Sequence, residues 1–240
     1  MDRQFNFWDS WVDITDIERR AIVATIRARD LVIKSVPKEV LVAIYIKGSF
    51  VRREMNEQSD VDMVPIVTQT KWESKVFEVN GLEVKPVMVV PLSLEEFAAN
   101  HLETKSEESI DLRVGPDKFL RMIDKYKLVY GKPLNPDDFP IRTDEEMYFD
   151  YKKIIVEGYI PLFLKGEIDF SPLLKEFFWM MEMRMASLEI KVPHTFVGIA
   201  KGAKNDPLVR EALRLRQKNL VDRDEQLQFV NRLREWVAIK

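Results

Sequence analysis

The stretch over residues 40–46, VLVAIYI, constrains the fold more than any other part of the chain. It carries no charge and consists of aliphatic and aromatic residues, a composition that is rich in β-formers and predicts a buried strand. A helix is expected before it over residues 15–34, because Thr15 and Glu18 form a capping box and apolar residues recur on one helical face.

The rest of the first half contains further strand and helix signals. A second strand is predicted over residues 60–67. Asn80-Gly81 is the strongest two-residue hairpin signal, and it predicts two strands over residues 74–79 and 82–90. The other expected elements are a short helix over 50–57, a helix from Ser93 to about 102, a helix over 117–125 and a strand over 128–130.

The second half differs in character from the first. Residues 132–140 hold three prolines and are the best linker candidate. Thr143 begins another capping box, and helical patterns follow near residues 171–190, 206–218 and 222–238. The aromatic and methionine residues near Trp179 are interpreted as bundle core. The predicted fold class is α+β, with a mixed-sheet domain over 1–138 and an all-helical C-terminal bundle over 139–240.

Composition excludes several kinds of site. The chain has no cysteine, which rules out disulfides, thiolate nucleophiles and cysteine-bound zinc. Its two histidines, His101 and His194, are far apart, so a metal site must be built mainly from carboxylate oxygens, which favours magnesium or manganese. The near balance of 37 basic and 40 acidic residues argues against a nucleic-acid-binding protein. No signal peptide or membrane span is recognisable, so a cytoplasmic protein without a membrane partner is expected.

The residues that can carry chemistry lie between the two predicted strands. Side chains alternate along a strand, so Asp60 and Asp62 are expected on one face, where they can hold one or two divalent cations. Gly48 lets the backbone approach a phosphate closely, and Ser49 offers a hydroxyl and an amide at the start of a helix. Arg52 would help to neutralise a triphosphate.

Gly48-Ser49, then Arg52, then SDVD over residues 59–62 together resemble the signature of the DNA polymerase β-type nucleotidyltransferase superfamily. The resemblance implies two Mg²⁺ ions held by Asp60 and Asp62, an NTP whose phosphates contact Gly48 and Ser49, and transfer of a nucleotidyl group to a hydroxyl. Arg53 departs from the pattern, because many relatives have a second glycine there.

The layout of nearly the whole chain is similar to that of the streptomycin/spectinomycin adenylyltransferases. By this resemblance Glu83, in the context Leu-Glu-Val, is the third carboxylate, which acts as the base and contacts metal; Glu78 is its main competitor. Those enzymes use a lysine of the bundle to reach the nucleotide. His194 stands at the comparable position here, and Lys201 or Lys204 could compensate.

The predicted function is therefore transfer of AMP from ATP to a hydroxyl of a small, aminoglycoside-like molecule, with release of pyrophosphate. Asp60, Asp62 and Glu83 are the predicted catalytic and metal-binding residues. ATP is expected in a cleft between the two domains. Two alternatives stay open: nucleotidylation of a protein or RNA acceptor, and a nucleotide-binding interaction protein without turnover. A fold does not determine the acceptor.

Overall fold

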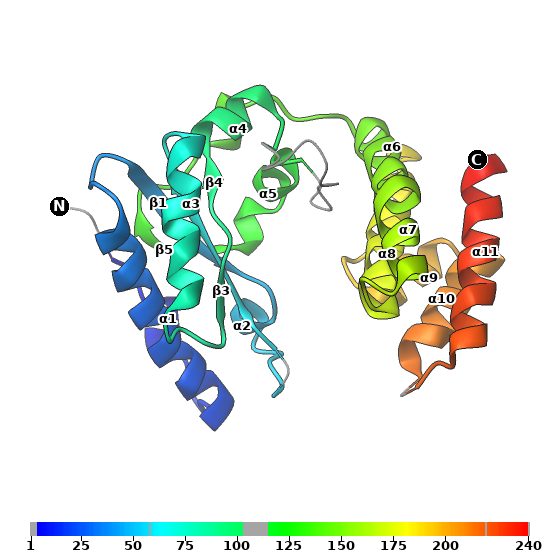
Figure 1. Cartoon of the computed structure of the whole chain (residues 1–240), viewed down its shortest axis with the longest axis horizontal. Helices are drawn as coiled ribbons and strands as arrows, with labels where there is room; N and C mark the ends of the chain where they lie inside the picture. Colours follow the sequence, from blue (N-terminus) through cyan, green and yellow to red (C-terminus); the bar gives the residue numbers. More distant parts are fainter. Residues whose placement is uncertain (1–3, 58, 103–114, 219, 240) are drawn as a thin grey trace. The chain divides into compact units, whose positions relative to one another are not determined.

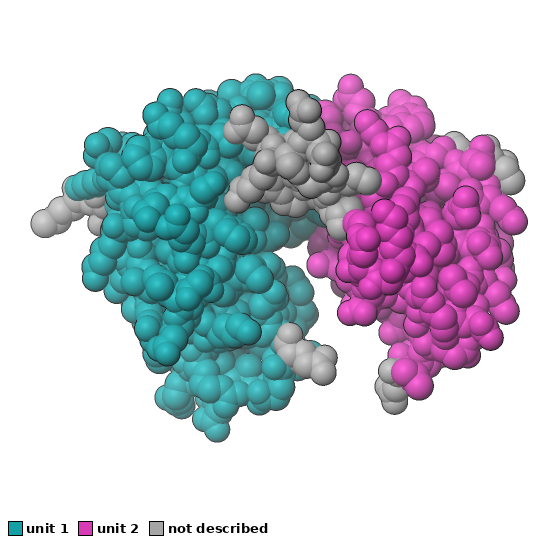
Figure 2. All heavy atoms as spheres, viewed as in Figure 1, with its two compact units in different colours: residues 1–103, 115–141 teal, residues 104–114, 142–240 magenta. Residues whose placement is uncertain are grey.

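The computed structural model describes residues 4–57, 59–102, 115–218 and 220–239. The chain divides into two compact units, coloured separately in Figure 2. Unit 1 holds residues 1–103 and 115–141, and the helices from residue 142 onward belong to unit 2. The predicted boundary after residue 138 stays a prediction, since a division by contacts does not test whether either part folds alone.

Unit 1 is built on a mixed sheet with the strand order β3-β2-β1-β5. The central strand β1 (Leu41–Lys47) is the uncharged run, and it pairs antiparallel with both β2 (Val61–Val67) and β5 (Lys127–Gly131). The short strands β3 (Val87–Val89) and β4 (Leu92–Ser93) both run parallel to β2. The prediction of a mixed sheet is confirmed.

Helices cover both faces of this sheet, as the buried strand requires (Figure 1). The long helix α1 (Asp16–Ser35) has the predicted capping box and packs its alanine-rich side with Ile44 and Ile46 of β1. Tyr45, whose side chain alternates to the opposite face, belongs to a second core with α4 (Leu94–Ala99) and α5 (Asp117–Arg121). Shorter helical elements of this unit are η1 (Phe7–Ser10), α2 (Ser49–Arg52), η2 (Thr70–Trp72), α3 (Glu73–Phe77), η3 (Glu78–Gly81), η4 (Ile123–Lys125) and η5 (Pro136–Asp138).

The predicted hairpin around Asn80-Gly81 is wrong. The chain forms α3 and η3 there, and neither Asn80 nor Gly81 has the positive φ that a type I′ turn needs. The Asn80 side chain instead donates to the carbonyl of Val89 and accepts from its amide, both at 2.8 Å. Asn80 therefore holds β3 in place rather than turning the chain. The expected helix over 50–57 is also too long, because α2 ends at Arg52.

Unit 2 is helical, which confirms the predicted helical C-terminal half. Buried aromatic and methionine side chains of α8 (Phe170–Ser187), including Phe177 and Met181, form much of its core. The remaining helices are α6 (Asp144–Ile154), the π-helix η6 (Ile155–Tyr159), α7 (Ile160–Lys165), α9 (Phe196–Gly202), α10 (Pro207–Gln217) and α11 (Arg223–Ile239). Among the described residues, no helix is both long and apolar enough to cross a bilayer.

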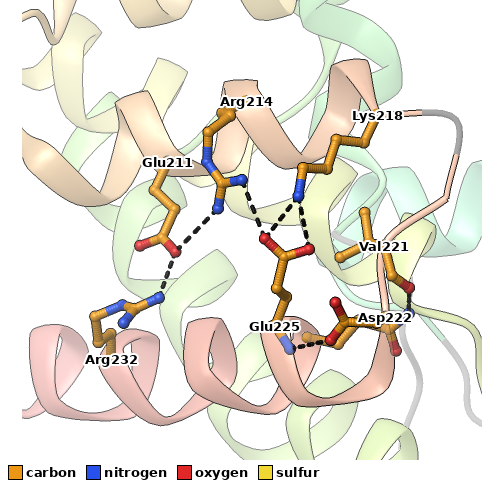
Figure 3. Close-up of polar contacts among 8 residues, drawn as sticks. Glu211, Arg214, Lys218, Val221, Asp222, Glu225 and Arg232 are labelled. Carbon is orange, nitrogen blue, oxygen red and sulfur yellow. Dashed lines mark hydrogen bonds and ion pairs between the residues drawn. The ribbon is translucent and has the colours of Figure 1, made fainter.

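An ion-pair network joins α10 to α11 on the surface of unit 2 (Figure 3). The carboxylate of Glu225 lies 2.7 Å from Lys218 Nζ and 3.1 Å from Arg214 Nη1. Arg232 of α11 pairs with Glu211 of α10 in the same network. Each charge is matched by an opposite one, so this cluster links two helices and leaves none of the five groups without a partner.

Candidate active site

The turn after β1 and the aspartate of β2 meet at one corner of the sheet. Gly48 turns the chain from Lys47 into α2 with φ 85° and ψ −156°, a combination essentially restricted to glycine. A Cβ atom at this position would lie 2.7 Å from Oδ2 of Asp62. Glycine is therefore required twice, by the backbone conformation and by the carboxylate beside it.

The two predicted metal ligands lie at the start of β2. Asp62 is half-buried and is the cross-strand partner of Lys47, whereas Asp60 is exposed and precedes the first residue of the strand. In the part of the chain that the structure describes, three polar groups here make no hydrogen bond or ion pair: the Lys47 ammonium, the Ser49 hydroxyl and the Asp60 carboxylate. These groups are available to a ligand.

Tyr126 is a neighbour of this corner that the sequence did not reveal. Burial, and after it the negative charges of Asp62 and Asp124, raise the pKa of its phenol above the usual value. Its ring packs against Phe119 at 5.0 Å between centroids, on the sheet face that α5 covers. The raised pKa keeps the phenol protonated to higher pH than in an exposed tyrosine, so its hydroxyl can donate a hydrogen bond beside Asp62. Only the pairing of distant segments brings Tyr126 here, and no local motif marks it.

The two arginines after the turn have different partners. The exposed Arg52, the predicted phosphate ligand, forms an ion pair with Glu54 at 2.6 Å. Arg53 takes the left-handed conformation, with φ 58°, and forms an ion pair with Glu18 at 2.8 Å. A glycine would adopt this left-handed conformation without steric cost. The ion pair with Glu18 of α1 instead holds Arg53 in this conformation.

The structure does not bring Glu83 to the aspartate pair. Glu83 lies in a bend between η3 and β3, its side chain is 92% exposed, and it faces Arg27 of α1 at 3.5 Å. No group of three or more His, Asp or Glu side chains suited to a metal occurs among the described residues. The physical reason is the missing hairpin: the residue of β3 beside Asp62 is Met88, not a glutamate. Glu83 as a third metal ligand therefore stays a prediction, which its exposed position does not support. The alternative, Glu78, pairs with Lys75 at 2.7 Å.

A general base has to come within hydrogen-bond reach of the acceptor hydroxyl, which would attack beside the metal-bound phosphates. The catalytic role of Glu83 therefore stays a prediction, separate from its role as a ligand.

The predicted nucleotide ligands of unit 2 lie on and beside α9. The His194 ring stacks on Trp179 at 4.3 Å between centroids, and Nδ1 lies 2.7 Å from the Glu182 carboxylate. Glu182 fixes the orientation of the ring and leaves Nε2 as the other polar atom. Lys201 is exposed and makes no ion pair within the described ranges. Sequence reasoning missed Glu182, although a carboxylate among the buried methionines of α8 was a usable signal.

The residues present fit a magnesium site of a particular kind. Mg²⁺ prefers oxygen ligands and is often held by one or two carboxylates together with substrate phosphates. Asp60 and Asp62 can supply the carboxylates, and the absence of a side chain at Gly48 keeps Oδ2 of Asp62 from being blocked. The site would thus be completed by a nucleotide rather than by a third side chain.

Comparison with solved structures gives a match over most of the chain. The spectinomycin adenyltransferase AAD(9) from Enterococcus faecialis, crystallised with ATP and spectinomycin, superposes with a TM-score of 0.54 at 14% sequence identity. The match covers 90% of this chain and 99% of that one. This chain has the fold of a nucleotidyltransferase. The resemblance predicted from the sequence is thereby confirmed for the fold. No protein-family model matches the sequence, and no curated protein matches it.

Proposed function

We propose that this protein is an adenylyltransferase that moves AMP from ATP to a hydroxyl of a small-molecule acceptor. The observation that carries the proposal is the corner in which Gly48 lies against the Asp62 carboxylate, with Asp60 and Ser49 beside it and without side-chain partners in the described chain. The same fold occurs in an enzyme crystallised with ATP and an aminoglycoside-type acceptor, spectinomycin.

In the proposed reaction, an acceptor oxygen forms a bond to the α-phosphorus, and the bond from that phosphorus to the pyrophosphate oxygen breaks. Asp60 and Asp62 would hold magnesium, which when bound supplies positive charge to the phosphates. The backbone at Gly48 and the Ser49 hydroxyl would bind the phosphates, and Arg52 would add charge after release from Glu54. Glu83 is the proposed base that accepts the acceptor proton.

His194 and Lys201 of unit 2 are proposed as further nucleotide ligands. Glu182 orients His194 so that Nδ1 faces the carboxylate, which leaves Nε2 for a phosphate oxygen when the ring is protonated. Lys201 supplies a further unpaired ammonium in the described part of the chain. An aminoglycoside-like acceptor is proposed because the matching enzyme was crystallised with spectinomycin.

A nucleotide-binding protein without turnover is the second candidate. It is favoured by one observation: Glu83 is exposed, and the described residues contain no group of three side chains suited to a metal. Glu83→Gln tests Glu83 as the proposed base. We expect turnover to fall about a hundredfold, the typical contribution of a general base, while ATP binding is retained. Glu78→Gln is the matched control. Unchanged turnover in Glu83→Gln would mean that Glu83 is not the base and only forms the ion pair with Arg27.

The first experiment is calorimetry of ATP with and without Mg²⁺, on the wild type and an Asp60→Ala/Asp62→Ala variant. We expect magnesium-dependent binding that the variant loses. Pyrophosphate release is then measured with a panel of hydroxyl acceptors, spectinomycin among them. If neither ATP nor another NTP binds the wild type, the proposed activity is wrong. Binding without pyrophosphate release from any acceptor would support the second candidate.

A further inference from the structure

The segment before α1 is tied to unit 1 at both of its ends. The Phe5 amide donates to the carbonyl of Val129 in β5 at 3.0 Å, and Gln4 forms a bridge with Tyr130. At the other end, Thr15 caps α1 through its side chain. Residues 4–15 therefore run along the folded unit as an ordered strap.

Aromatic side chains of this strap surround the residue that follows the phosphate turn. Phe50, the residue after Ser49, is fully buried. Its ring lies 5.7 Å from that of Phe7, 6.0 Å from that of Trp8 and 5.3 Å from that of Trp11, measured between centroids. These rings hold the first turn of α2 from one side, and Trp8 itself is buried.

Arg53 fastens the other end of α2 to the same strap. Its Nη1 donates to the Val12 carbonyl and its Nη2 to the Asp13 carbonyl, each at 3.0 Å. The guanidinium also bonds to Glu18 at 2.8 and 3.1 Å and lies 5.0 Å from the centre of the Trp11 ring. One side chain thus joins α2, the strap and the start of α1.

We infer that this strap is the support that positions the Gly48-Ser49 turn for nucleotide phosphates, with Arg53 and Glu18 as positioning residues. A four-residue helix does not hold its own conformation, because helix nucleation is unfavourable. Phosphate-binding groups must be held to within about 0.5 Å by the residues behind them. Phe50 and Arg53 follow the turn, in α2 and at its C-cap, and each is anchored by the strap. The inference rests on the proposed function for the identity of the ligand.

The test uses Arg53→Gly, which keeps the left-handed conformation accessible and removes only the side-chain bonds, together with Trp11→Ala. Arg20→Gln is the control, since Arg20 forms an exposed ion pair with Glu57 and contacts neither ring nor turn. Two properties are measured on the full chain: the Kd for ATP with Mg²⁺, and hydrogen exchange of the amides of residues 48–54.

We expect both strap variants to raise the Kd about tenfold and to speed exchange at residues 48–54, while residues 61–67 and the control stay as in the wild type. An Arg53→Gly/Glu18→Gln double variant should behave like Arg53→Gly alone, because Arg53→Gly already removes the ion pair that Glu18→Gln weakens. Unchanged exchange at residues 48–54 in both variants would overturn the inference even if the wild type binds no ATP. A wild type that binds no ATP, with faster exchange in the variants, would refute the proposed function and retain the support role.

Discussion

Two clusters of charged groups in this protein are built in opposite ways. On unit 2, Lys218 and Arg214 share the Glu225 carboxylate, and Glu211 pairs with Arg232 (Figure 3). At the corner of unit 1, Lys47 and Asp60 lie near one glycine turn, and neither forms an ion pair within the described chain.

Surface ion pairs contribute little free energy, and charges that already have partners have little left for a ligand. The paired cluster of unit 2 therefore joins two helices, whereas the groups at the corner of unit 1 can bind a ligand.

Asp62→Asn should have the largest effect of these changes. It removes a charged oxygen from the corner, so magnesium-dependent ATP binding is expected to weaken at least about a hundredfold while the unfolding midpoint changes little. Calorimetry and thermal unfolding measure the two quantities. Asp137→Asn, an exposed aspartate of the same unit, is the control. Equal affinity in Asp62→Asn and the wild type would place the nucleotide elsewhere.

Gly48→Ala tests the corner through its backbone. The new methyl group would meet Asp62 Oδ2, and the glycine-only conformation adds strain of about 1–3 kcal/mol. We expect lower stability and at least about tenfold weaker ATP binding. Gly81→Ala is a matched control, because no atom lies within 4 Å of its added Cβ and its φ is not positive. If both alanine variants have the same stability and ATP affinity, the close approach of Gly48 to Asp62 is not required for either property.

The lowered pKa of Glu18 predicts how the free energy of unfolding depends on pH. The hydrogen bond from Arg53, with those from Thr15, lowers the pKa of Glu18 from 4.5 to about 2. A carboxyl whose pKa is lower in the folded state stabilises it above the unfolded pKa, and that stability is lost as the pH falls through the folded pKa.

The free energy of unfolding should therefore drop by about 1–2 kcal/mol between pH 5 and pH 2 through this group. Glu18→Gln should flatten this part of the profile, measured by urea unfolding at several pH values. Glu57 is an exposed carboxyl, so Glu57→Gln should leave the pH dependence of the free energy of unfolding as in the wild type.

Lys218→Ala is expected to have the smallest effect. It removes one of the two cations that share Glu225, both on the surface, so stability should fall by at most about 0.5 kcal/mol and ATP binding should not change. The loss should shrink further in 1 M salt, because salt screens exposed pairs. A large loss of ATP affinity would mean that the paired cluster also binds ligand.

Sequence alone was sufficient where the interactions are local. The capping boxes at Thr15 and Thr143 are present as predicted, because each joins residues only three positions apart. The uncharged run became the central strand of a mixed sheet. Gly48 and Asp62 lie together because β1 and β2, which are joined by a short connection, pair antiparallel.

Tertiary structure decided the features that depend on distant partners. Asn80 bonds to the backbone of Val89 instead of forming a hairpin turn, and this choice placed Glu83 in an exposed bend and Met88 beside Asp62. Arg53 donates a hydrogen bond to Glu18, which lies 35 positions away in the sequence. A local pattern records which conformations a few residues favour, whereas strand register and long-range hydrogen bonds depend on the packing of the whole unit. For that reason the sequence determined the elements and the motif, and only the fold decided which side chains surround it.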